Sequence, residues 1–150
     1  MPRIRIADAP VHDGTGYPPP FDQPCLLRKR WALGDAAGLV DFGVNLQQLA
    51  PGAWSSQRHW HTQEDEFVWV VQGEVVLVTD AGEEVLCAGD CAGFRAGVPD
   101  GHHLQNRSGA PALLLTVGSR KPQTDVAHYP DIDLRYSVAD GDTHKDLRPY

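Results

Sequence analysis

Residues 58–67 read RHWHTQEDEF, and the spacing of the histidines and the glutamate in this stretch indicates both an architecture and a chemistry. His59 and His61 are two positions apart, so on a β-strand both imidazoles project from one face, with Cα atoms roughly 6.5–7 Å apart. Both rings can then reach one ion. A polar turn over residues 62–64 is expected to reverse the chain and to bring the Glu66 carboxylate beside the histidines by antiparallel pairing. The stretch therefore predicts two nitrogens and an oxygen that face one point.

Residues 101–106, GHHLQN, offer a further imidazole. Because successive side chains of a strand point to opposite faces, His102, Leu104 and Asn106 share one face, and His103 and Gln105 share the other. Only one of the two histidines can therefore face inward.

The remainder of the chain is typical of an all-β protein. It holds 15 Gly and 12 Pro among 150 residues, and short apolar segments separated by turn residues recur about every ten positions from residue 25 onward. Such regular short strands predict a sandwich or a barrel. No long segment keeps a helical period, and residues 34–39 are interpreted as a connection rather than a helix. The predicted strands cover 26–32, 39–49, 54–61, 66–71, 74–79, 83–87, 91–95, 102–106, 112–118 and 132–137.

The chain is divided into three parts on this basis. Residues 1–24, rich in Pro, Gly and Asp, are predicted to form an extended arm, residues 25–120 the barrel, and residues 121–150 a tail that packs on the barrel or on a partner subunit. The strand over 66–71 carries apolar side chains on both faces, with Glu66 its sole charged residue, so both faces need cover. That cover comes either from the N-terminal arm or from a second subunit, and we expect a homodimer.

Charge and composition exclude several classes of protein. The chain has 13 Lys and Arg against 20 Asp and Glu, a formal net charge of −7, which argues against a nucleic-acid partner. No apolar stretch is long enough for a membrane helix, and the N-terminal residues do not resemble a secretory signal. Three cysteines cannot form a closed set of disulfides, and Cys87 and Cys91 lack the second pair of a zinc ribbon. We therefore expect a cytoplasmic protein without a membrane partner.

The two histidine segments together resemble the paired motifs of the cupin superfamily. The first motif consists of Gly, His-x-His, Glu and Gly, and the second of Gly, Pro-x-Gly, His and Asn. In this sequence the matching positions are Gly52, His59, His61, Glu66 and Gly73, followed by Gly89, Gly97, His102 and Asn106. The resemblance covers residues from about 40 to 118 and extends more loosely to small single-domain cupins, most of them without an assigned reaction.

The second motif departs from the family pattern in two places. Arg95 stands at the usual Pro position, and residues 98–101 make the spacer before the histidine longer than usual. The longer spacer leaves His103 and Asp100 as alternative ligands. His102 is preferred because its spacing to Asn106 is intact and the strand alternation agrees.

The resemblance implies a double-stranded β-helix, a jelly-roll barrel, with a metal inside near one mouth. The implied ligands are His59, His61, Glu66 and His102. Three imidazoles and one carboxylate suit one divalent transition metal, Mn, Fe, Co, Ni, Zn or Cu, rather than the oxygen cage that Ca or Mg prefers. An octahedral ion with four protein ligands keeps two positions for water, substrate or dioxygen.

The pocket is expected to bind a small molecule. Ser55 and Gln57 face inward by parity with His59 and are predicted to line it. A divalent ion makes the pocket cationic, so the ligand is expected to be anionic or polyoxygenated. The hypothesis is metal-centred chemistry of isomerase, dioxygenase or lyase type on a small oxygenated acid or sugar. The alternatives are a non-catalytic module that binds or senses a carboxylate or carbohydrate, and a metal-free carbohydrate-binding barrel.

Overall fold

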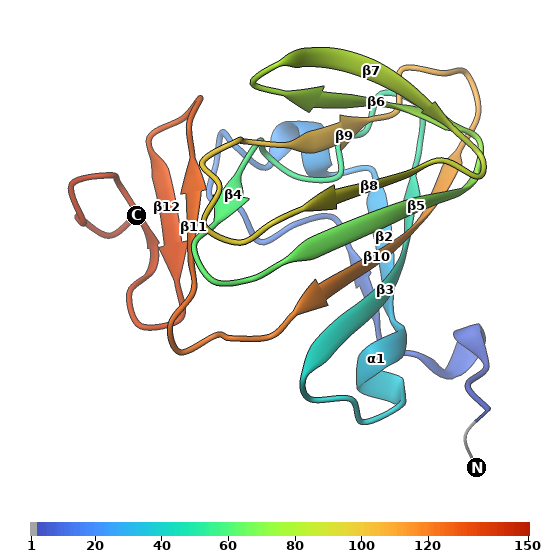
Figure 1. The fold of residues 1–150 in the computed structure, drawn as a ribbon, viewed down its shortest axis with the longest axis horizontal. Helices are drawn as coiled ribbons and strands as arrows, with labels where there is room; N and C mark the ends of the chain where they lie inside the picture. The colour runs from blue at the N-terminus through green and yellow to red at the C-terminus, as the bar shows by residue number, and fades with distance from the viewer. Residues whose placement is uncertain (1–2) are drawn as a thin grey trace.

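The computed structural model describes residues 3–150, and most of its regular structure is β-strand (Figure 1). One short α-helix, α1 (Leu33–Ala36), and two 3₁₀ turns, η1 (Ile6–Asp8) and η2 (Gln23–Cys25), are its helical elements. No helix in the described part is both long enough and apolar enough to cross a membrane. The strands are β1 (Val11–Asp13), β2 (Arg28–Ala32), β3 (Phe42–Leu49), β4 (Trp60–His61), β5 (Glu66–Gln72), β6 (Glu74–Thr79), β7 (Gly82–Cys87), β8 (Cys91–Phe94), β9 (His103–Gln105), β10 (Ala112–Ser119), β11 (Val126–Tyr129), β12 (Leu134–Ser137) and β13 (Gly141–Thr143).

The strands form two facing sheets and a third sheet at one end (Figure 1). The larger sheet has the order β1-β2-β3-β10-β5-β8, and the sheet that faces it has the order β7-β6-β9. The third sheet, β13-β12-β11-β4, lies at the open end of the barrel. All pairings are antiparallel, and strands distant in sequence, such as β3 and β10, are neighbours. The predicted all-β jelly roll is confirmed.

The hydrophobic core fills the space between the two facing sheets. Alternation along β5 buries Val68 and Val70 against side chains of the opposite sheet. Full burial of an aliphatic side chain of this size contributes about 1.5–3 kcal/mol to the free energy of unfolding. The buried members of this cluster are Leu49, Ala53, Val68, Val70, Val75, Leu77, Leu86, Leu104, Ala112 and Leu114.

The hairpin between β5 and β6 requires glycine. Gly73 has a φ of 81°, in the left-handed region that side chains disfavour. A Cβ at this position would also lie 3.1 Å from the Ala112 Cα and from the Pro111 carbonyl oxygen. The glycine that closes the first motif is therefore explained by backbone geometry rather than by chemistry.

Two predictions about local structure are wrong. Residues 33–36 form one helical turn, whereas 34–39 were expected to be a connection. One turn is too short to show a period, and packing fixes it, because a Cβ on Gly34 would lie 2.8 Å from the Val44 nitrogen of β3. Residues 54–61 do not form a continuous strand: Trp60 and His61 alone form β4, while Trp54 and His59 make isolated bridges.

Both ends of the described chain add strands that sequence analysis did not predict. In the arm, β1 pairs with β2 at the edge of the large sheet. In the tail, β11 pairs with β4 and with β12, and β13 follows β12. These strands are three or four residues long, so they are too short to show an alternating pattern.

The outer face of the large sheet is apolar, and at β5 it is exposed. Phe67, Trp69 and Val71 of β5 have exposed fractions of 44%, 43% and 39%. Their paired neighbours on this face are Val117 and Leu115 of β10, followed by Val44 and Leu46 of β3. The described part of the arm pairs with β2 at the edge of the sheet and leaves Phe67 and Trp69 of β5 exposed. Of the two covers expected for this face, the N-terminal arm does not reach it within residues 3–150. A second subunit is therefore the expected cover.

We therefore expect a homodimer that pairs through the outer face of β5, since one apolar patch is sufficient for a two-fold interface. Light scattering should give twice the mass of the chain for the wild type and the single-chain mass for Trp69→Glu, with its circular dichroism spectrum unchanged. Val85→Glu is the matched control, because Val85 of β7 is also exposed (57%) but lies on the other sheet. A monomeric wild type, or a dimer that Val85→Glu dissociates and Trp69→Glu does not, would contradict this assignment.

Candidate metal centre

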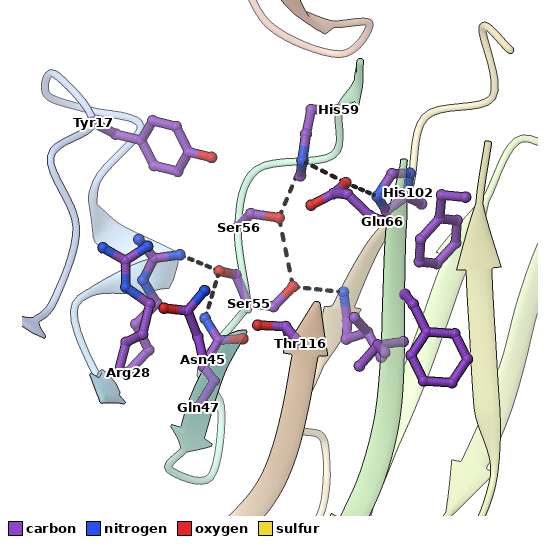
Figure 2. Close-up of a pocket in the computed structure, with 15 residues that line it drawn as sticks. Tyr17, Arg28, Asn45, Gln47, Ser55, Ser56, His59, Glu66, His102 and Thr116 are labelled. Atoms are coloured by element: carbon purple, nitrogen blue, oxygen red, sulfur yellow. Dashed lines mark hydrogen bonds and ion pairs between the residues drawn. The ribbon is translucent and has the colours of Figure 1, made fainter. Parts of the chain in front are cut away.

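Three imidazoles converge on the carboxylate of Glu66, the first residue of β5. Figure 2 shows two of them, His59 and His102, beside this carboxylate. The Oε2 atom of Glu66 lies 2.7 Å from Nε2 of His102, 3.4 Å from Nε2 of His59 and 3.6 Å from Nε2 of His61. His59, His61 and Glu66 each offer a ligand atom within 4.8 Å of the others. His102 lies outside that group of three, but it is the ring nearest the carboxylate.

The backbone fixes which of the adjacent histidines joins this cluster. An antiparallel bridge pairs His59 with His102, with backbone N–H···O distances of 3.2 and 2.9 Å. His102 therefore lies beside His59, and His103 points to the opposite face, where its Nδ1 is 3.0 Å from the Ser56 carbonyl oxygen. Asp100, the other alternative, uses its carboxylate to accept a hydrogen bond from the Asp80 backbone N–H.

Hydrogen bonds on the far side of two rings determine how the rings face Glu66. His59 Nδ1 lies 2.9 Å from the Gln57 carbonyl oxygen and His61 Nδ1 lies 2.6 Å from a carboxylate oxygen of Asp125. Both partners accept hydrogen bonds, so Nδ1 carries the proton in each neutral ring. The Nε2 lone pairs then point toward an anionic oxygen, and this repulsion requires a proton or a metal ion between them.

The pKa values reflect this arrangement. Burial of the Glu66 carboxyl acts to raise its pKa, but the histidines, His59 first, outweigh burial and hold the pKa well below its usual range. Burial of the His59 ring opposes its charged form, yet the Glu66 carboxylate outweighs it and raises the pKa of His59. Burial lowers the pKa of His102. His102 Nδ1 is buried and makes no hydrogen bond within residues 3–150.

Asp125 supports the cluster and was missed by sequence analysis. It precedes β11, far along the chain from the motif, and its side chain is 9% exposed. Besides the contact with His61, its carboxylate accepts a hydrogen bond from the Gln63 backbone N–H at 2.8 Å. Nothing in the motif spacing points to this residue, because the pairing of β11 with β4 is what brings it to His61.

A second group, His61, Glu64 and Asp125, also has ligand atoms within 4.8 Å of one another. Its carboxylates have structural partners: Glu64 accepts a hydrogen bond from the Lys121 backbone N–H, and Asp125 holds His61 and Gln63. It contains one imidazole, and that ring faces it with its protonated nitrogen. The group around Glu66 is therefore the better match to a transition metal.

A cavity of about 270 Å³ adjoins the cluster (Figure 2). His59, Glu66 and His102 form one wall, and side chains of β2, β3 and β10 form the opposite wall. Ser55 lines the cavity, and its hydroxyl accepts a hydrogen bond from the Leu104 backbone N–H. Gln57 is not among the lining residues, because its amide donates to the Phe21 carbonyl oxygen of the arm at 2.7 Å. The lining residues are Tyr17, Arg28, Arg30, Asn45, Gln47, Ser55, Ser56, His59, Glu66, Phe67, Val68, Phe94, His102, Leu104 and Thr116.

Comparisons with known proteins agree with this geometry. A family model described as a cupin domain matches residues 45–118. A sugar phosphate isomerase of the cupin superfamily from Silicibacter pomeroyi is 44% identical, with a TM-score of 0.92 over 99% of this chain and 96% of its own. A putative sugar phosphate isomerase from Acidithiobacillus ferrooxidans is 33% identical, with a TM-score of 0.69 over 73% of this chain and 69% of its own.

One more distant structure shares the fold alone. The polyketide cyclase RemF from Streptomyces resistomycificus is 18% identical and has a TM-score of 0.70 over 88% of this chain and 87% of its own. The comparison with curated proteins found no match.

Asp125 provides a test of how the cluster is supported. If His61 binds a metal through Nε2, Asp125→Asn should weaken the affinity for Co²⁺ about 10- to 100-fold, because the carboxylate that orients the ring and makes it more basic is lost. The affinity is measured by visible absorption of Co²⁺ added to metal-stripped protein. Asp133→Asn is the control, since Asp133 is also in the tail but bonds Lys145 and His144. An unchanged affinity in Asp125→Asn would show that His61 needs no support from the tail.

Proposed function

The chain belongs to the cupin superfamily, and on this basis we propose that it is an isomerase of a small phosphorylated sugar that depends on one divalent transition metal. The observation that carries the proposal is the convergence of three Nε2 atoms on Glu66, beside a cavity lined with polar groups. The 44% identity over nearly the whole chain with a protein named a sugar phosphate isomerase supports the reaction and the substrate class.

The donor set fits a metal ion. His59, His61 and His102 would hold it through Nε2 and Glu66 through its carboxylate, and the candidate metals are Mn, Fe, Co, Ni, Zn and Cu. The hydrogen bonds of His59 and His61 support this fit, since Nδ1 of each neutral ring carries the proton and leaves Nε2 free to coordinate. A bound divalent ion supplies Lewis-acid polarisation of a carbonyl or hydroxyl oxygen.

The surrounding side chains would bind the substrate and restrict water. The ring of Phe94 stacks on His102, with centroids 3.5 Å apart, and covers that ligand. Tyr17 reaches the cavity from the arm and keeps its hydroxyl proton, because burial raises its pKa to about 12. Asn45 and Thr116 present an amide and a hydroxyl to the same space. These neutral groups suit the hydroxyls of a sugar.

One observation favours a non-catalytic alternative. Glu66 is the one carboxylate that lines this cavity within residues 3–150, and the proposed metal site uses it. An isomerase needs a base to move a proton between carbon atoms. If Glu66 serves the metal alone, the cavity would bind a sugar phosphate or a carboxylate without turnover.

Turnover distinguishes these functions. Metal-loaded protein is incubated with small aldose and ketose monophosphates, and product is followed by NMR while thermal stability and metal content are measured on the same samples. We expect conversion of at least one sugar phosphate, with loss of activity after chelation. His59→Ala should lower kcat by about 100-fold or more, since a ligand matters more than its outer partners.

His12→Ala is the matched control, because His12 lies on β1 and is exposed. It should keep both metal and activity. Stabilisation by a sugar phosphate or a carboxylate without product would identify the binding module instead. A wild type that neither binds nor converts any of these compounds, or that keeps no metal, would contradict the proposal.

A further inference from the structure

Arg30 lies on the wall of the cavity opposite the histidine cluster. It follows Arg28 by two positions on β2, so both guanidinium groups extend to the inner face of the sheet, and both line the cavity. In the register, Arg30 pairs with Gln47, and the next inward-facing row holds Asn45 beside Thr116. Polar groups of three neighbouring strands therefore form one continuous surface.

The charge of Arg30 has no partner in the described chain. Within residues 3–150 its guanidinium makes no hydrogen bond and no ion pair, although the residue is half-buried. Arg28 differs, because it donates to the carbonyl oxygens of Gly14 and Ser55. Three arginines elsewhere in the fold have carboxylate partners, namely Arg58 with Asp131, Arg107 with Glu83 and Arg120 with Asp35.

This arrangement is unfavourable without a ligand. Burial lowers the pKa of Arg30, and the neighbouring charge of Arg28 lowers it further. The Asp35 carboxylate acts to raise this pKa, but Asp35 forms its ion pair with Arg120. The side chains of Asn45 and Thr116 also make no hydrogen bond with any residue from 3 to 150 (Figure 2). The guanidinium of Arg30, the amide of Asn45 and the hydroxyl of Thr116 thus face the same space without hydrogen-bond partners from residues 3–150.

The position of Arg30 relative to Glu66 indicates the length of the ligand. In the order β2-β3-β10-β5 their strands are three spacings apart, about 14 Å along the sheet, and the two side chains shorten this gap. A small molecule can therefore contact Arg30 at one end and the histidine cluster at the other.

We propose that Arg30, with Asn45 and Thr116, binds the phosphate group of a small phosphate monoester whose other end reaches the histidine cluster. This assignment rests on the proposed function, which identifies the other end of the ligand as a sugar. The guanidinium fork offers paired N–H donors that match a phosphate, and the charge of Arg28 beside it favours a dianion over a monoanion. The acidic chain thus holds a cationic cavity, which explains how an anion enters a protein of net charge −7.

Inorganic phosphate tests the site without reference to turnover. Its affinity for the full-length metal-loaded protein is measured by calorimetry for the wild type, Arg30→Gln and Lys29→Gln. Lys29 is the matched control, since it is adjacent on β2 but lies on the outer face beside Asp13 and Trp31. We expect Arg30→Gln to weaken phosphate binding by about 10- to 100-fold, the usual contribution of charge-assisted hydrogen bonds, and Lys29→Gln to leave it unchanged.

Thermal unfolding without phosphate separates a ligand-binding residue from a structural one. If the role of Arg30 is to bind an anion, Arg30→Gln should have a melting temperature equal to or above that of the wild type, because the substitution removes a partly buried charge without a partner. A lower melting temperature would assign Arg30 to the fold and overturn the proposal. A second result would also overturn the proposal: if His59→Ala abolishes phosphate binding and Arg30→Gln leaves it intact, the metal is the phosphate site.

Comparison of phosphate with acetate and succinate tests the chemical class. Carboxylates that bind as tightly as phosphate, with the same dependence on Arg30, would overturn the assignment to a phosphate monoester. The result is independent of turnover: a wild type that converts no sugar phosphate but binds phosphate through Arg30 would contradict the isomerase and support this site.

Discussion

A carboxylate enclosed by three histidine rings is the feature on which the open end of the barrel depends. Glu66 begins β5, and the sheet and the bridge between His59 and His102 bring the rings to it. Two of those rings have their outer nitrogens occupied by hydrogen-bond acceptors, so their inner lone pairs oppose the carboxylate. An arrangement of this kind is stable only with positive charge at its centre.

The segments outside the motif hold these rings in place. The pairing of β11 with β4 brings Asp125 to His61, and the carbonyl of Gln57 fixes the ring of His59. Gln57 itself is held by the arm, through its hydrogen bond to Phe21. The arm and the tail are therefore part of the same structural unit as the cluster, although they lie outside the two motifs.

The sequence predicted what depends on local periodicity. Strand alternation was sufficient to place His59 and His61 together, and Glu66 meets them as predicted. The antiparallel pairing expected after His61 does not form, because β4 pairs with β11 while β5 pairs with β10 and β8. Alternation also separated His102 from His103. The prediction that Gln57 lines the cavity, made from strand alternation, is wrong. Residues 54–59 do not form a regular strand, so alternation does not determine which side Gln57 faces. Asp125 could not be predicted, since a short strand with no pattern of its own brings it to the cluster.

The inner surface of the large sheet changes character along its length, and this change accounts for a binding cavity within a stable fold. At one end Leu49, Leu114 and Val70 pack to complete burial. Toward the mouth, β3 and β10 present Asn45 and Thr116, and the neighbouring β2 presents Arg30. The apolar rows stabilise the barrel, and the polar rows keep unused hydrogen-bonding capacity for a ligand.

The most direct test of the metal centre is a crystal structure of protein purified without added metal, with diffraction data collected on both sides of the absorption edge of the metal that fluorescence identifies. We expect one anomalous peak per chain, bonded by Nε2 of His59, His61 and His102 and by the Glu66 carboxylate. No peak at this position, or a peak between Glu64 and Asp125 instead, would contradict it.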